Sequence, residues 1–132
     1  MATVTAAITL TSAAGDLLTD ALSLSDSTAI TASETTGLAR MKVTATSAGG
    51  SATTLYTADD FAAIAYIYIK NTDATATDYI YVYDDTTSGD PVILKLAGGN
   101  WALMPTIADK TLKAYATTNP TVVEFMVFGT DQ

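Results

Sequence analysis

The chain alternates its side chains with a period of two along several short segments. The alternation is clearest at 64–70 (IAYIYIK), 79–83 (YIYVY) and 121–128 (TVVEFMVF). β-Branched and aromatic residues dominate these segments and turn-forming residues bound them, which is typical of strands. No long window keeps apolar residues at helical spacing. Because a parallel sheet needs crossover helices, the sequence argues against a βαβ architecture.

The pattern predicts an all-β protein, an antiparallel β-sandwich or jelly roll of about 8–10 strands. The only helical signal is one short turn near 57–62, where Thr57 could cap a turn that begins with acidic residues. The expected strands cover residues 3–10, 17–24, 38–46, 53–57, 63–70, 78–84, 91–96, 100–104, 111–116 and 121–128.

The length of 132 residues fits a single domain, 1–132. Its N-terminal third differs from the rest. Residues 1–15 contain no charged and no aromatic side chain, and residues 25–36 are mostly Ser, Thr, Ala and Asp. Such segments bury less apolar area per residue than 61–128, so 1–15 is expected to be an arm or edge strand used in assembly.

A first hairpin is expected between segments 63–70 and 78–84. A register that sets Tyr66 opposite Tyr81 gathers tyrosines on one face and aliphatic residues on the other. A second hairpin is expected between 91–96 and 100–104. Gly98 and Gly99 would form its two-residue turn, because glycine permits the positive φ of such turns.

The composition excludes several classes of function. The chain has no cysteine and no histidine, so it has no thiolate nucleophile, no histidine-based triad and no cysteine-type zinc site. The net charge is −8 and the six basic residues are scattered, which argues against nucleic-acid and anionic-membrane partners. The start lacks a signal-peptide pattern, and the longest apolar run, 61–69, is too short to span a membrane. We therefore expect a protein that is not an enzyme and uses no cofactor.

Acidic residues are the candidates for metal binding and for acid/base catalysis. Asp84, Asp85 and Asp90 could ligate calcium, which takes six to eight oxygen ligands, or could cap the backbone of a solvated turn. Asp59 and Asp60 could contribute to an acid/base pair, but neighbours on a strand point to opposite faces, and a turn or helix start is the simpler interpretation.

Glu124 lies within the most apolar strand and shares its face with Val122, Met126 and Phe128. If this face is buried, the carboxylate needs a partner, for which Lys113 is the candidate. The alternatives are that the face meets solvent or an oligomer interface, and, least favoured, that Glu124 is a functional acid.

The tyrosines form the most distinctive feature of the sequence. Their apolar bodies and polar tips suit protein interfaces and sugar stacking, although they could equally form one wall of the core or a half-covered outer face. Trp101 is expected to fill the core. The candidate interface residues are Val4, Ile8, Leu10, Tyr66, Tyr68, Tyr79, Tyr81 and Tyr83.

The rhythm of the segments IYIKNTD (67–73), YIYVY (79–83), LAGGNW (96–101) and the closing strand VEFMVF resembles that of small virion proteins of tailed bacteriophages. The resemblance covers about half of the chain and transfers no catalytic residues. It implies a β-sandwich or jelly roll that decorates heads, cements capsomers or belongs to tails and fibres. By analogy with such proteins, it also implies a homotrimer.

These observations favour a non-enzymatic capsid decoration (cement) protein on the outer head surface, with the major capsid protein as its partner. Its N-terminal segment would be ordered by neighbouring copies or by capsid subunits, for example by strand addition to a sheet edge. The alternative is a tail- or fibre-associated module that recognises a host receptor or glycan. A hydrolase that uses only carboxylates is a distant third.

Overall fold

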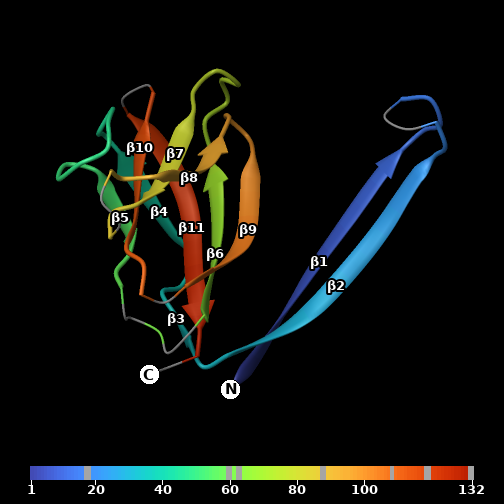
Figure 1. Cartoon of the computed structure of the whole chain (residues 1–132), viewed down its shortest axis with the longest axis horizontal. Coiled ribbons are helices and arrows are strands. Elements are labelled where there is room, and N and C mark those ends of the chain that lie inside the picture. The colour runs from blue at the N-terminus through green and yellow to red at the C-terminus, as the bar shows by residue number, and fades with distance from the viewer. Residues whose placement is uncertain are drawn as a thin grey trace. The chain divides into compact units, whose positions relative to one another are not determined.

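The computed structural model describes residues 1–16, 19–58, 61, 64–86, 89–107, 109–117 and 120–130. The protein is all-β and its paired strands are antiparallel, as predicted (Figure 1). The described residues include no helix long and apolar enough to cross a bilayer. The strands are β1 Ala2–Ser12, β2 Leu22–Ala32, β3 Glu34–Thr35, β4 Ala39–Val43, β5 Thr53–Tyr56, β6 Ile64–Asn71, β7 Ile80–Asp84, β8 Val92–Leu96, β9 Trp101–Ile107, β10 Leu112–Ala116 and β11 Thr121–Gly129.

The chain divides into two compact units, Met1–Ala32 and Ser33–Gln132. The first unit is a two-stranded ribbon in which β1 and β2 pair along their full lengths, from Ala2 opposite Ala32 to Ser12 opposite Leu22. Since opposed residues share a face, the even-numbered residues form one face and the odd-numbered residues the other. The even face, here called the aliphatic face, presents Ala2, Val4, Ala6, Ile8, Leu10, Leu22, Leu24, Ile30 and Ala32, together with Ser12, Asp26 and Thr28.

The odd face of the ribbon carries Thr, Ser and Ala side chains only. This alternation explains a boundary that the sequence prediction missed. The strand expected at 17–24 begins instead at Leu22 and continues to Ala32, through residues rich in Ser, Thr and Ala that the list of expected strands did not include. Residues 17 and 18 lie outside the described residues, as do Asp59, Asp60 and residue 62 of the turn expected near 57–62.

The second unit is a β-sandwich of two packed sheets. One sheet has the strand order β5-β10-β7-β8, and the other has the order β3-β11-β6-β9, with β4 also paired to β11. Figure 1 shows β6 between β11 and β9. Every second residue of each strand points into the space between the sheets. Ile67, Val82 and Val127 are such residues, and they have no solvent exposure. The core therefore rests on the same period-two pattern that predicts the fold.

The first expected hairpin is wrong. β6 pairs with β11 and β9, whereas β7 pairs with β10 and β8, so the two segments belong to different sheets. Tyr66 and Tyr81 consequently lie on the outer faces of opposite sheets. Alternation defines which side chains face the core, but it does not define which strand lies next door.

The second expected hairpin is also wrong, because β8 belongs to the four-stranded sheet and β9 to the five-stranded sheet. The connection between them does contain a turn, in which the Asn100 N–H donates to the Ala97 carbonyl at 3.0 Å. Gly99 has φ +81°. A Cβ on Gly98 would collide with the Thr75 carbonyl, so this glycine allows two crossover connections to touch.

Asn71, at the end of β6, holds this corner of the sandwich together. Its side chain is fully buried, and its Nδ2 donates to the carbonyls of Asp78 at 2.7 Å and Leu96 at 3.1 Å. Its Oδ1 accepts from the Asp73 N–H at 3.1 Å. One amide thereby links the end of a strand in one sheet to the start of β7 and the end of β8 in the other.

We expect Asn71→Ala to lower the free energy of unfolding by about 3 kcal/mol, because it removes a donor from one buried and one partly buried carbonyl and removes packed volume. Urea denaturation measures the change. Asn100→Ala is the matched control, since that side chain is exposed, and we expect a change within about 0.5 kcal/mol. Equal effects of the two substitutions would contradict this account of the corner.

Candidate interaction surfaces

The outer face of the five-stranded sheet is unusually apolar for a surface that points away from the core. Residues in register across β11, β6 and β9 form its rows, such as Met126, Tyr68 and Leu103. Trp101, expected in the core, lies on this face and is 56% exposed. We call this surface the outer apolar face and define it by Tyr66, Tyr68, Trp101, Leu103, Pro105 and Met126.

Glu124 also lies on this side of the sheet, and its partner is Arg40 rather than Lys113. The Glu124 Oε2 atom is 2.9 Å from the Nε and from an Nη atom of Arg40, across the β4–β11 pair. Lys113 was the wrong partner because β10 belongs to the other sheet. Of the interpretations weighed for this parity, the one in which it faces away from the core agrees with the structure.

Basic side chains surround the outer apolar face. Arg40 and Lys42 extend from β4, opposite Glu124 and Val122 of β11, and Lys70 of β6 lies between Glu124 and Trp101 in one row. Half of the chain's six basic residues therefore occur on this face, together with one described carboxylate in the same rows. In a chain with net charge −8, this is a locally basic surface.

Tyr68 and Glu124 interact directly on this face. Burial raises the pKa of the Tyr68 phenol, and the negative charge of Glu124 and its hydrogen bond with the phenol raise that pKa further. The carboxylate thus accepts from the Arg40 guanidinium, and its charge also acts on the Tyr68 phenol. Only 16% of the Glu124 side chain is exposed, against 72% for Arg40.

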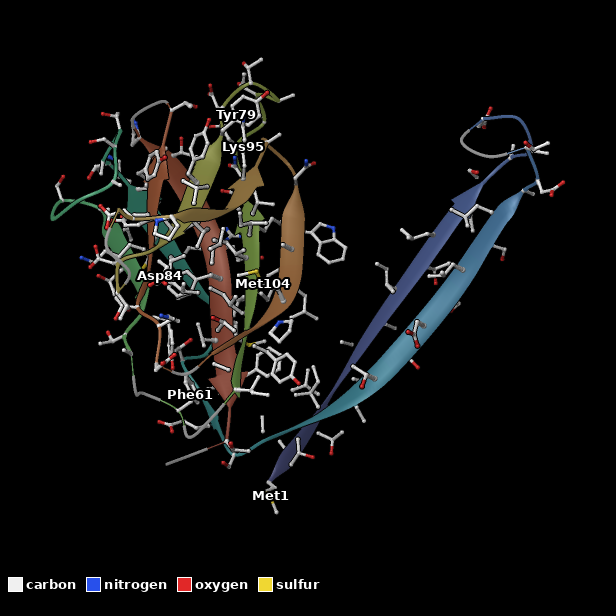
Figure 2. The ribbon with its side chains drawn as sticks, in the orientation of Figure 1. Met1, Phe61, Tyr79, Asp84, Lys95 and Met104 are labelled. Carbon is white, nitrogen blue, oxygen red and sulfur yellow. The ribbon has the colours of Figure 1, made fainter. Side chains whose placement is uncertain are left out.

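The outer face of the four-stranded sheet carries the other tyrosines. The rings of Tyr81 and Tyr115 stack with centroids 4.9 Å apart, and the Lys95 Nζ lies 3.9 Å from the ring centroid of Tyr79. Figure 2 shows Tyr79 and Lys95 close together at one end of the sandwich. Because these ring faces already contact one another or a lysine, they offer less open surface for sugar stacking than the sequence suggested.

Tyr83 differs from the other candidate interface residues because it is fully buried. Its hydroxyl donates to the Gly49 carbonyl at 3.2 Å and accepts from the Gly49 N–H at 3.0 Å. The chain's own loop before β5 therefore occupies its polar tip. The tyrosine stripe of the sequence is thus divided among two outer faces and one internal contact.

The acidic cluster does not converge on a common point. Asp84 is buried, accepts from the Thr86 N–H at 2.8 Å and has the Lys110 Nζ at 3.6 Å. Asp85 pairs with Lys113 at 2.6 Å, and this hydrogen bond raises the pKa of Lys113. Among the described residues, Asp90 included, no three acidic side chains come together as a metal-binding group.

The ribbon places Val4, Ile8 and Leu10 together on its aliphatic face. Ile8 is 45% exposed, Leu10 is 47% exposed, and Leu24 opposite Leu10 is 45% exposed. Leu24 is the last residue of the strand expected at 17–24 but was not among the candidate interface residues, because the pairing of that strand with β1 was not predicted. Its Ser-Leu-Ser context is nevertheless an alternation that matches β1.

Comparison of the chain with protein-family models gave no match. Comparison with curated proteins gave no match either.

Alkaline titration tests the contact between Tyr68 and Glu124. A phenol whose folded pKa exceeds the unfolded value of 10.0 gives its full contribution to stability below pH 10.0, and that contribution is lost as pH rises through the folded pKa. We expect Tyr68→Phe to lower the unfolding free energy at pH 7 by about 1 kcal/mol and to make the decline above pH 10 shallower.

Urea denaturation between pH 7 and pH 11 measures both effects. Part of the alkaline decline should persist in the variant, because Lys113 also has a raised pKa. Tyr79→Phe, on the other sheet, controls for the loss of one hydroxyl. Superimposable alkaline profiles of Tyr68→Phe and the parent protein would refute the assignment.

Proposed function

We propose that this chain is a non-enzymatic structural protein of a phage virion, a capsid decoration (cement) protein that binds the outer head surface and stabilises contacts between capsomers. The observation that carries the proposal is the ribbon. Met1–Ala32 forms a unit of its own, and its aliphatic face leaves Ile8, Leu10 and Leu24 about half-exposed, whereas Ile30 and Ala32 are buried. Two-stranded ribbons are marginally stable alone, so this unit is suited to assembly.

The mechanism is physical. A decoration protein contributes buried contact area at each of many equivalent positions, and the sum over the shell resists internal pressure. A sandwich with few charged residues and a long ribbon provides one rigid body and one element that a neighbour can order. The major capsid protein is the proposed partner, and copies of the chain itself are the second.

β1 enters such an assembly as half of a ribbon. Its whole length already pairs with β2, so one of its two edges is occupied. This favours contact through the aliphatic face over the addition of β1 as a single strand to a sheet edge.

Reconstitution on heads tests the proposal. Heads of the encoding phage are prepared without the chain, and purified chain is added. We expect saturable binding at a fixed ratio to the major capsid protein, measured by co-sedimentation, and greater resistance of the decorated heads to heat, measured by DNA release. Purified tails from the same phage are the control particles.

Binding to tails and not to heads would overturn the decoration role and support the alternative, a tail- or fibre-associated module that recognises a receptor or glycan. A Tyr79→Ala and Tyr81→Ala double variant separates these functions further. Head binding should survive this change, since the two rings contact Tyr115 and Lys95 on the four-stranded sheet.

A further inference from the structure

We propose that the ribbon of one copy docks with its aliphatic face on the outer apolar face of the five-stranded sheet of a neighbouring copy. The inference rests on the proposed structural role and deepens it by naming the surface that the ribbon contacts on a second copy of this chain. Both surfaces belong to the described residues, and neither is part of the sandwich core.

The two faces match in character. The aliphatic face presents small and branched side chains, with Leu10 directly opposite Leu24 in its exposed part, while Ile30, opposite Val4, is already buried. The outer apolar face supplies larger side chains, among them Trp101 and Tyr68. Small residues on one surface let the aromatic residues of the other approach closely, as they do between the sheets of a sandwich.

Charge favours the same pairing. Residues 1–32 include Asp16, Asp20 and Asp26 and no lysine or arginine. The sheet face has Arg40, Lys42 and Lys70 near its apolar rows. Two copies with a net charge of −8 each repel one another overall, so an acidic ribbon on the basic face is the contact that opposes this repulsion.

Ribbon-to-ribbon packing is less favourable by the same argument. Two aliphatic faces brought together would place two copies of Asp26 in one apolar layer, where an unpaired carboxylate is costly to bury. The sheet face instead offers cations for that carboxylate. One residue, Ser33, joins β2 to β3, and docking on a second copy does not depend on the angle at this joint.

The buried area indicates a closed assembly. At ~3.3 Å per residue and about 4.8 Å between strands, the ribbon is ~36 Å long and ~10 Å wide, so its face covers on the order of 360 Å². One docked ribbon buries ~700 Å² over both surfaces, below the ~1,200–2,000 Å² of stable interfaces. When two copies exchange ribbons reciprocally, the interface between them buries at most ~1,400 Å², which lies within that range.

Single cysteines test the contact sharply, because the chain has none of its own. A Leu24→Cys variant is mixed with an affinity-tagged Leu103→Cys variant, and a short bismaleimide is added to the purified chains without capsids. We expect the mixed covalent dimer to be the main product. Its yield should exceed at least five-fold that of Thr9→Cys with Leu103→Cys, and that of Leu24→Cys with Lys95→Cys.

These controls are matched to the two faces. Thr9 lies on the opposite face of the same ribbon, and Lys95 lies on the outer face of the other sheet. A predominance of Leu24→Cys homodimers would overturn the inference in favour of ribbon-to-ribbon packing. A chain that stays monomeric and cross-links only within a double Leu24→Cys, Leu103→Cys variant would overturn it in favour of docking within one copy.

Native mass by light scattering is the second measurement. The parent chain should exceed the monomer mass of 13.7 kDa, and a homotrimer would give about 41 kDa. Leu24→Asp should raise the concentration for half-assembly at least ten-fold, whereas Thr9→Asp should change it less than two-fold. A monomeric parent chain that still decorates heads would overturn this inference and leave the proposed function intact.

Discussion

The sandwich depends on one constraint: its two sheets pack through the side chains of every second residue of each strand. Ile67, Val82 and Val127 are fully buried because alternation turns every second residue of their strands inward. The remaining residues of those strands must then face outward, and in this chain many of them are aromatic or aliphatic. The core and the outer apolar face thus have one origin. The core is formed by the aliphatic residues that point inward, and the outer apolar face is formed by the residues that alternate with them and point outward.

Alternation also explains what the sequence could predict. The expected strands 63–70, 111–116 and 121–128 agree with β6, β10 and β11 to within a residue or so, since each has a clear period and clear breakers. The pairing of strands could not be predicted in the same way. The period defines faces, whereas neighbours depend on how the connections after β6 and β8 run. Gly98, expected in a hairpin turn, instead allows a close approach to Thr75 from a different loop.

The candidate surfaces show the same limit. Glu124 was correctly placed on a face with Met126, but its partner Arg40 could be found only once β4 was seen beside β11. Tyr83 shares the parity of Tyr81, yet a loop distant in sequence covers it through Gly49. Leu24 ends the strand expected at 17–24, but its place opposite Leu10 became visible only once β1 and β2 were seen to pair. In each case the local pattern identified the face of a strand, and long-range topology decided what lay against it.

The two-unit organisation separates two sources of stability. The sandwich has a continuous core and a buried amide, Asn71, that ties its sheets together, so it holds its fold through internal contacts. The ribbon has hydrogen bonds between β1 and β2 but leaves Ile8, Leu10 and Leu24 about half-exposed. Burying these side chains would add to the stability of the ribbon, because two-stranded ribbons are marginally stable alone. Under the proposed docking, the area that stabilises the ribbon is the same area that joins it to a neighbour, so the ordering of the first 32 residues is coupled to assembly.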